Sequence, residues 1–209
     1  DLDTDYGIFK EELLKNEPKL SQAIEYGGGI RILNQDFFEV LISFIISQNN
    51  NIPRIKKCIE AVCKRYGEPL GVIEGEERFA FPSVAALSDA DPEDIKTLRL
   101  GYRAPYIVES AKKFSKEGVP KGTYKEKYEK LLSYCGIGPK VANCISLFGL
   151  RDLEAFPIDT WVKKIMVDMF GFKENDTREM QSFAKEKFGE YGGIAQQYLF
   201  YFYRDRNIK

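Results

Sequence analysis

The residue best suited to do chemistry in this sequence is a lysine that follows a glycine-rich break between two helical segments. Residues 124–150 predict an amphipathic helix to about Cys135 and a second, apolar helix from Pro139. Lys140 would then lie in the first turn of the second helix. A neutral lysine amine is a nucleophile that forms a Schiff base with an electrophilic carbon, and burial or a helix N-terminus favours the neutral form. A phosphate-pairing or solvated lysine is the alternative at this position.

The break itself, Gly136-Ile137-Gly138, has the composition of a sharp backbone reversal. The aliphatic side chain of Ile137 would fill the junction between the two helices. The amides of the turn and of the following helix N-terminus would point to one place, where they can bind a phosphate oxygen without side-chain charge. A bare G-x-G is also compatible with a plain αα turn. The lysine two residues after the second glycine makes the pattern much more specific.

A carboxylate follows in the segment Pro157-Ile158-Asp159-Thr160-Trp161, 19 positions after Lys140. Asp159 comes after a loop and before a further helix, so its simplest role is an N-cap. The same carboxylate would also stabilise positive charge that develops on a sugar and help to move protons at the lysine. The two roles are compatible because a capping aspartate is held rigidly.

Three more segments narrow the interpretation: SQNNNIPRI at 47–55, LGYRAPYI at 100–107 and AQQYLF at 195–200. With the hairpin lysine and the proline–aspartate loop they resemble the 8-oxoguanine DNA glycosylase family of the helix–hairpin–helix glycosylase superfamily. The resemblance covers about residues 30–203. It implies a bifunctional DNA glycosylase and AP lyase that excises 8-oxoguanine, preferably opposite cytosine, through a lysine Schiff base in base excision repair.

The resemblance assigns catalytic and base-pocket roles to five residues. Lys140 matches the Schiff-base lysine, and Asp159 matches the catalytic aspartate. Cys144 and Phe200 match the residues that sandwich the flipped base, and Gln196 matches the amide that bonds its Watson–Crick edge. A duplex base must leave the stack before its C1′ is attacked, so contacts that hold the extruded base offset that cost. Without the resemblance, Cys144 and Phe200 would be interpreted as core residues.

Four other residues match the group that replaces the flipped base and contacts its partner. Asn49 matches the asparagine that fills the gap, and Tyr102 matches the wedge that kinks the duplex. Arg54 and Arg103 match the arginines that read the orphaned cytosine, as the guanidinium preference for base acceptors favours. Taken alone, the run at 49–51 is also typical of a loop after a helix.

Two departures from the family pattern stand out. Some members have a histidine two residues after the aspartate, where this chain has Trp161. Family members also begin with a β-rich domain that senses the extra N7 hydrogen of 8-oxoguanine. The chain starts at Asp1 rather than Met, and we expect that domain to be absent and the parent protein to be longer.

Hydrophobic periodicity predicts an all-α fold, a helix–hairpin–helix glycosylase bundle of roughly ten helices. A helical stripe of six residues marks one of these helices: Ile52, Ile55, Ile59, Val62, Cys63 and Tyr66. Residues 36–48 are apolar nearly all round and predict a buried central helix. We expect residues 1–30 and 150–209 to form one subdomain and residues 31–149 the other.

Composition sets limits on cofactors and partners. The net charge of −1 gives no global attraction to nucleic acid, so a DNA site must be a local patch. The four cysteines lack metal-site spacing and histidine is absent, so we expect no metal, iron–sulfur cluster or other cofactor, apart from a monovalent cation at the hairpin. We expect double-stranded DNA as partner, a monomer and no membrane association, with a cytoplasmic location in a bacterium or a nuclear one in a eukaryote.

Two alternatives remain. A glycosylase for another damaged purine would fit the fold, although relatives for alkylated purines use water attack and lack the hairpin lysine. A non-catalytic helix–hairpin–helix module would grip the phosphate backbone with salt-dependent affinity and no chemistry. Borohydride trapping separates these possibilities, because it captures only a lysine imine.

Overall fold

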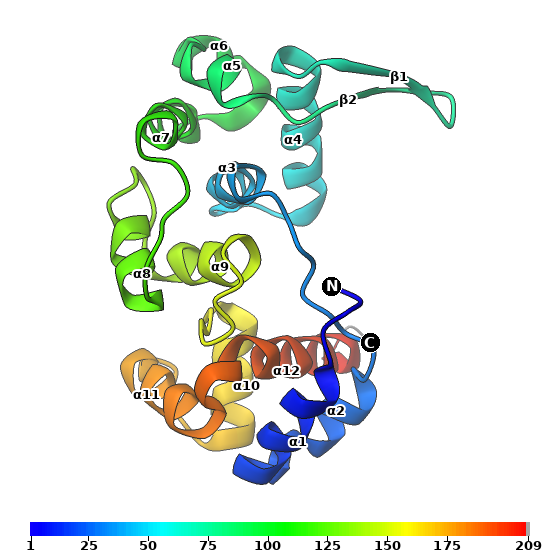
Figure 1. Cartoon of the computed structure of the whole chain (residues 1–209), viewed down its shortest axis with the longest axis vertical. Coiled ribbons are helices and arrows are strands. Elements are labelled where there is room, and N and C mark those ends of the chain that lie inside the picture. The colour runs from blue at the N-terminus through cyan, green and yellow to red at the C-terminus, as the bar shows by residue number, and fades with distance from the viewer. Residues whose placement is uncertain (208–209) are drawn as a thin grey trace. The chain divides into compact units, whose positions relative to one another are not determined.

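The computed structural model describes residues 1–207, and helices dominate it (Figure 1). The predicted all-α class is confirmed. In chain order the elements are α1 (Tyr6–Asn16), η1 (Pro18–Leu20), α2 (Ser21–Tyr26), α3 (Phe37–Ser47), α4 (Ile52–Tyr66), β1 (Pro69–Ile73), β2 (Glu76–Phe79), α5 (Val84–Ser88), α6 (Pro92–Ile95), η2 (Lys96–Leu100), α7 (Arg103–Glu117), α8 (Tyr124–Leu132), α9 (Pro139–Gly149), α10 (Thr160–Phe170), α11 (Thr177–Phe188), η3 (Gly189–Tyr191) and α12 (Gly192–Asn207). No helix among the described residues has the length and apolar character needed to cross a bilayer.

Contacts divide the chain into two compact units. Unit 1 consists of residues 1–34 and 146–209, and unit 2 consists of residues 35–145. The divisions expected from the sequence lay after residues 30 and 149. The chain passes from unit 2 back to unit 1 within α9, so both units share that helix.

Unit 2 is built around α3, which the sequence predicts as a buried central helix. Seven of its residues are buried, among them Leu41, Ile42 and Ile45. α3 packs against α4 and α7. The Phe38 ring stacks on Phe114 of α7 with 5.2 Å between ring centroids. The all-round apolar pattern of this helix is therefore explained by neighbours on several sides.

Helix α4 forms where expected, but its buried face differs from the predicted stripe. Asn51 caps it by accepting a hydrogen bond from the Arg54 amide at 3.0 Å. Cys58 and Val62 are the buried residues, whereas Ile52 is 65% exposed. The stripe was wrong at Ile52 because this residue lies at the helix start, beyond the reach of the core.

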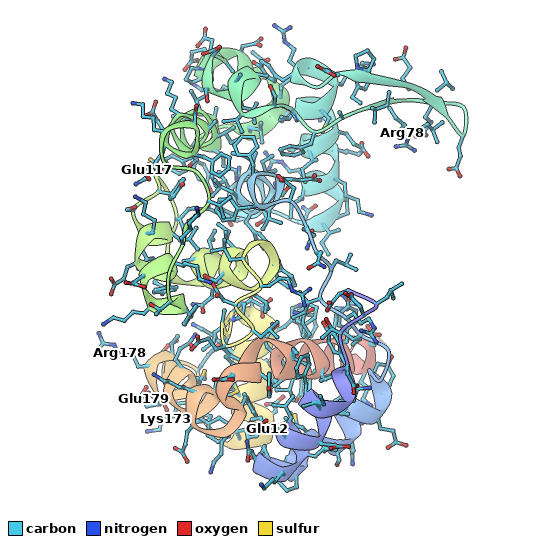
Figure 2. All side chains as sticks on the ribbon, viewed as in Figure 1. Glu12, Arg78, Glu117, Lys173, Arg178 and Glu179 are labelled. Atoms are coloured by element: carbon cyan, nitrogen blue, oxygen red, sulfur yellow. The ribbon has the colours of Figure 1, made fainter. Side chains whose placement is uncertain are left out.

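A β-hairpin between α4 and α5 was not predicted. β1 and β2 pair antiparallel, from Pro69 opposite Phe79 to Ile73 opposite Glu76, and the hairpin extends away from the helices of its unit (Figure 1). The side chain of Arg78 lies out on this hairpin (Figure 2) and pairs with Glu76. All five residues of β1 are exposed, so no buried face imposes the two-residue alternation that predicts a strand.

Unit 1 is built around α12, whose residues Ala195, Tyr198 and Leu199 are fully buried. α12 packs against α2, α10 and α11. Residues from the first 34 positions complete this core, with Leu13 and Leu20 fully buried. Unit 1 thus depends on residues from both ends of the sequence.

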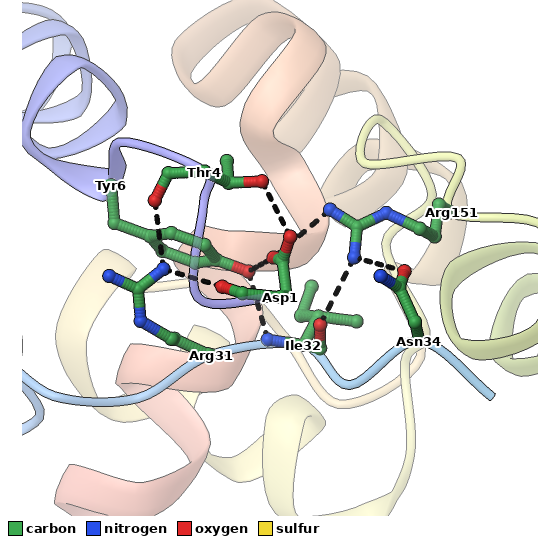
Figure 3. Close-up of polar contacts among 7 residues, drawn as sticks. All are labelled: Asp1, Thr4, Tyr6, Arg31, Ile32, Asn34 and Arg151. Atoms are coloured by element: carbon green, nitrogen blue, oxygen red, sulfur yellow. Dashed lines mark hydrogen bonds and ion pairs between the residues drawn. The ribbon is translucent and has the colours of Figure 1, made fainter.

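A polar cluster joins these distant segments of unit 1 (Figure 3). The Asp1 carboxylate, only 3% exposed in its side chain, pairs with Arg151 at 3.0 Å and accepts a hydrogen bond from the Tyr6 hydroxyl at 2.7 Å. Arg151 also donates to the Asn34 side chain at 2.7 Å and to the Ile32 carbonyl at 3.3 Å. The loop after α9 is thereby tied to the segments around residues 1 and 32–34.

Candidate active site

The glycine break forms a compact turn between α8 and α9. α8 ends at Leu132, three residues before the predicted end, and the chain then turns through amide-to-carbonyl bonds such as Ile137 to Tyr134 at 3.2 Å. Ile137 is buried, as expected for the side chain that fills the junction. α9 begins at Pro139, which is the predicted residue.

The two glycines of the turn differ in how strictly the structure requires glycine. Gly136 has φ +75°, and a Cβ there would lie 2.3 Å from the Tyr106 ring. This position therefore excludes every other residue by both backbone conformation and space. Gly138 has ordinary φ and open space around its Cα. Its backbone carbonyl accepts the first helical hydrogen bond, from Ala142 at 2.9 Å.

Lys140 is the second residue of α9 and is exposed. Its Nζ lies 5.9 Å from the centroid of the Phe44 ring of α3. Of the two features named for this lysine, a position at a helix N-terminus and burial, the structure shows the first and not the second. The expected place in the first turn of the second helix is confirmed, and the residue is exposed there.

Asp159 is the N-cap of α10 in unit 1. Its Oδ1 accepts a hydrogen bond from the Val162 amide at 2.8 Å, so the capping role is confirmed. The preceding residues Phe156, Pro157 and Ile158 are buried and fix the loop that leads to it. The carboxylate is partly exposed and has a second oxygen beyond the capping contact.

Gln196 and Phe200 lie one turn apart on α12, so they share a face of this helix. Gln196 is buried, and its Oε1 accepts a hydrogen bond from Gln197 Nε2 at 2.6 Å. Phe200 is half-buried, with the Arg204 guanidinium 5.3 Å from its ring centroid. Cys144, the other residue assigned to the base pocket, is buried in α9.

The four residues assigned to the opposite base meet in unit 2, around the turn that follows α3. Asn49 is exposed in a left-handed conformation, φ +45°, which asparagine tolerates better than most residues. Tyr102 is half exposed, and its hydroxyl lies 3.5 Å from the Gln48 carbonyl. Arg54 is exposed, and its Nη2 donates to the Arg99 carbonyl at 3.1 Å.

Arg103 has a more structural environment than its assigned role implies. It is 4% exposed, and its guanidinium donates to the carbonyls of Gln48, Asn49 and Leu100. Four of its five N–H groups are used in this way. Arg103 therefore holds the turn that presents Asn49, and one N–H remains for a base.

Several neighbours of these residues escaped the sequence analysis. Gln48 contributes the carbonyl shared by Arg103 and Tyr102, and its Nε2 is buried without a partner among the described residues. Gln197 orients Gln196, and Phe44 lies beneath Lys140. Backbone carbonyls carry no sequence signal, and only the position of Gln197 beside Gln196 was visible beforehand.

No group of three or more His, Cys, Asp or Glu in the part of the chain that the structure describes is arranged to hold a metal ion. The four cysteines are unbridged thiols.

An all-α fold with an exposed lysine two residues after a Gly-Ile-Gly hairpin defines the class of helix–hairpin–helix DNA glycosylases. Residues 42–190 match the family model "HhH-GPD superfamily base excision DNA repair protein". Residues 1–41 match the model "8-oxoguanine DNA glycosylase, N-terminal domain", which the sequence analysis did not expect. In this chain these residues contain α1, α2 and the start of α3.

Relatives point to the same family. The chain is 33% identical over 208 residues to a probable N-glycosylase/DNA lyase of Methanothermobacter thermautotrophicus and 36% identical over 203 residues to an N-glycosylase/DNA lyase of Arabidopsis thaliana. These matches cover 88% and 89% of this chain but 66% and 55% of the relatives. A crystal structure of the Clostridium acetobutylicum 8-oxoguanine glycosylase/lyase, in complex with double-stranded DNA containing cytosine opposite 8-oxoguanine, aligns over 100% of this chain and 73% of that one, with TM-score 0.91 and 41% identity. The chain therefore belongs to the HhH-GPD superfamily of base excision repair proteins and, within it, to the 8-oxoguanine DNA glycosylase family.

Proposed function

We propose that this chain carries the catalytic machinery of a DNA glycosylase and AP lyase that excises 8-oxoguanine opposite cytosine. The observation that carries the proposal is the exposed lysine in the first turn of the helix that follows the Gly-Ile-Gly hairpin. The N-terminus of a helix is in general a site that binds phosphate. The substrate in the Clostridium complex supports the choice of lesion and opposite base.

In the proposed reaction the neutral Lys140 amine attacks C1′ of the damaged nucleotide. The bond between C1′ and the base breaks, and the base leaves with the bonding electrons and takes up a proton. The amine nitrogen then loses a proton. Its lone pair forms a double bond to C1′ while the bond between C1′ and the ring oxygen breaks and that oxygen takes up a proton, which opens the sugar ring and leaves a protonated imine between Nζ and C1′. Loss of a proton from C2′ then expels the 3′ phosphate and cuts the strand, and water releases the enzyme.

Asp159 is proposed to stabilise the positive charge on the sugar and to move protons at the lysine. Its capping bond to the Val162 amide holds the carboxylate in one orientation. Lys140 is exposed, so the proposal is that the bound DNA covers its side chain.

Recognition is proposed to use two groups of residues. Gln196, Phe200 and Cys144 would hold the extruded base. Asn49 and Tyr102 would occupy the gap, while Arg54 reads the opposite cytosine with Arg103 behind it. The lysine supplies the nucleophile, so the proposed reaction needs no cofactor. The monovalent cation at the hairpin, the monomeric state and the cellular location remain predictions.

Borohydride trapping tests this function directly. The chain is mixed with a duplex bearing 8-oxoguanine opposite cytosine and treated with borohydride, which reduces the imine to a stable cross-link. We expect an adduct for the natural sequence and none for Lys140→Gln, with duplex binding changed little. A matched control is Lys121→Gln, an exposed lysine of the same unit, which should still be trapped.

Each outcome separates the candidate functions. An adduct that persists in Lys140→Gln would show that another amine is the nucleophile. Salt-dependent binding with no adduct on either damaged or abasic DNA would favour a non-catalytic module. An adduct on abasic DNA but none on 8-oxoguanine would point to another lesion.

A further inference from the structure

Unit 2 contains a pocket whose lining residues, apart from Arg54, have no role in the proposed function. Its volume is about 510 Å³, and it lies between α4 and the turn at residues 97–99. Three cations line it: Arg54, Lys57 and Arg99. The rest of the lining is uncharged and includes the apolar residues Leu98 and Ala61.

The geometry of α4 explains this combination. Arg54, Lys57, Cys58 and Ala61 follow the i, i+3, i+4, i+7 spacing of one helical face. Cations therefore occupy the start of that face, and small or apolar side chains follow. Lys56 lies on the same helix but does not line the pocket.

The cations of the pocket are not neutralised by acidic side chains. Among the described residues none of the three makes an ion pair, and the nearby Asp94 is bound by Arg65 and Tyr66. Arg54 is anchored to the turn through the Arg99 carbonyl, which leaves further N–H groups for a ligand. The positive charge of the pocket is thus available to an anion.

The backbone conformation of Arg99 is an observation separate from the charge of the pocket. Its φ of +65° and ψ of 23° put it in the left-handed region, which costs energy for a residue with this side chain. Gly101 just beyond has φ +55° and ψ −130°. The turn keeps a strained arginine in the lining of the pocket, at a position where a glycine or asparagine would fit the backbone better.

A second pocket in the same unit is also lined by charged residues, but these do not all have the same sign. It measures about 390 Å³ and lies between the other face of α4 and β2. Its charged residues have both signs, with Glu60, Glu76 and Glu77 against Lys64 and Arg78, and two ion pairs join Lys64 to Glu77 and Arg78 to Glu76. In the first pocket the charged lining residues are all cations and make no ion pair among the described residues, and the other lining residues include apolar ones.

We propose that the Arg54–Lys57–Arg99 pocket binds one sugar–phosphate unit of the DNA strand opposite the lesion. Lys57 and Arg99 contact the phosphodiester beside the cytosine that Arg54 reads, and the deoxyribose lies against Leu98 and Ala61. The choice of strand rests on the proposed function, because Arg54 is there assigned to the opposite cytosine. Lys57 and Arg99 would thus be positioning residues that fix the register of that strand.

Salt dependence of DNA binding tests the proposal. Affinity of the 209-residue chain is measured by fluorescence anisotropy between 50 and 200 mM NaCl on a duplex that carries a non-cleavable abasic analogue opposite each base in turn. Lys57→Ala and Arg99→Gly should each lower the slope of log K against log salt by about one, equally for all four opposite bases. Glycine is chosen at position 99 because it accepts the left-handed backbone.

Matched controls keep the result specific to the pocket. Two controls should leave the slope unchanged. One is Lys56→Ala on α4, and the other is Lys96→Ala in η2, where the lysine pairs with Glu93 of α6. Arg99→Lys should restore most of the slope lost in Arg99→Gly. Slopes that fall equally in the pocket variants and the controls would overturn the proposal.

Replacing single phosphodiesters of the DNA by uncharged methylphosphonates locates the phosphate that the pocket contacts. Single methylphosphonates are placed along either strand, and their effect is compared in the natural chain and in the Lys57→Ala, Arg99→Gly double variant. One position on the opposite strand should weaken the natural chain and leave the double variant unaffected. Coupling on the damaged strand alone, or nowhere, contradicts the proposal. Trapping is measured separately, so loss of chemistry with this coupling intact would count against the proposed function alone.

Discussion

At the scale of single residues, the turn before Lys140 depends on one glycine more than on the other. Gly136→Ala places a Cβ against the Tyr106 ring and forces an alanine into φ +75°. We expect a loss of about 2–4 kcal/mol in unfolding free energy from overpacking and backbone strain. Urea denaturation measures it. Gly138→Ala is the control and should change stability by less than about 1 kcal/mol, because nothing lies within 4 Å of its Cβ. Equal losses would mean that the turn is not held as described.

The two arginines assigned to the orphaned cytosine should differ in what their removal costs. Arg54→Ala should relax the preference for cytosine with little loss of stability, since the side chain is exposed. Arg103→Ala should relax it too and also destabilise the protein by about 2–3 kcal/mol, because three backbone carbonyls lose their donor. Excision rates opposite all four bases, together with denaturation, separate the two effects. Equal rates opposite every base in the natural chain would leave the assignment without basis.

Specificity should also depend on Gln197. Its side chain bonds the Gln196 carbonyl oxygen, so Gln197→Ala frees the amide of Gln196 to rotate. We expect weaker discrimination between 8-oxoguanine and undamaged guanine, while trapping on an abasic site stays unchanged because no base is recognised there. Gln197→Glu serves as a second variant, since an ionised carboxylate cannot donate this bond. Unchanged discrimination in both variants would remove Gln197 from base recognition.

The candidate site was predictable for those side chains that belong to a motif with a characteristic spacing. Lys140, Asp159 and the hairpin glycines lie where motif and spacing indicated, and the N-cap of α10 is confirmed. The exposure of Lys140 and the burial of Arg103 were not predictable, since both depend on partners far along the chain. The Gln48 carbonyl that organises the opposite-base turn has no sequence signature, because every residue carries one.

At the scale of elements, α4 and α6 are joined by hydrogen bonds that should respond to pH. The Tyr66 hydroxyl and the Arg65 guanidinium hold the pKa of Asp94 below its ordinary value, and burial raises the pKa of Tyr66 to about 12. A lowered carboxyl pKa adds stability above the ordinary aspartate value and loses it as pH falls through the folded-state value. Tyr66→Phe should therefore lower the melting temperature at pH 7 and have a smaller effect near pH 2. A constant difference across this range would contradict the linkage.

Helices were predicted well and the hairpin was not, for a common physical reason. α3 and α9 bury a large part of their surface, so their cores leave apolar patterns in the sequence. The β1–β2 hairpin buries almost nothing, and its tip at Glu74 and Gly75 depends on positive φ at both positions. The apolar stripe of α4 misled at Ile52 because exposure at a helix start follows from tertiary neighbours alone.

At the scale of the whole molecule, stability should concentrate in the Asp1–Arg151 cluster (Figure 3) rather than in surface ion pairs. Arg151→Ala leaves the Asp1 carboxylate buried with only hydroxyl partners, so we expect a loss of about 1–3 kcal/mol. Arg78→Ala on the exposed hairpin removes the pair with Glu76 and should cost less than about 1 kcal/mol. Chemical denaturation compares the two variants, and similar losses would argue against a buried role for the cluster.

The discontinuity of unit 1 has a consequence for biosynthesis. Residues 1–34 leave the ribosome before unit 2, yet the core that buries Leu13 and Leu20 also includes α12, which is made after unit 2. Unit 2 is continuous and can fold as soon as it emerges. Until α12 emerges, Leu13 of α1 and Leu20 of η1 lack part of the core that buries them, so chaperones would bind exposed apolar side chains in this interval.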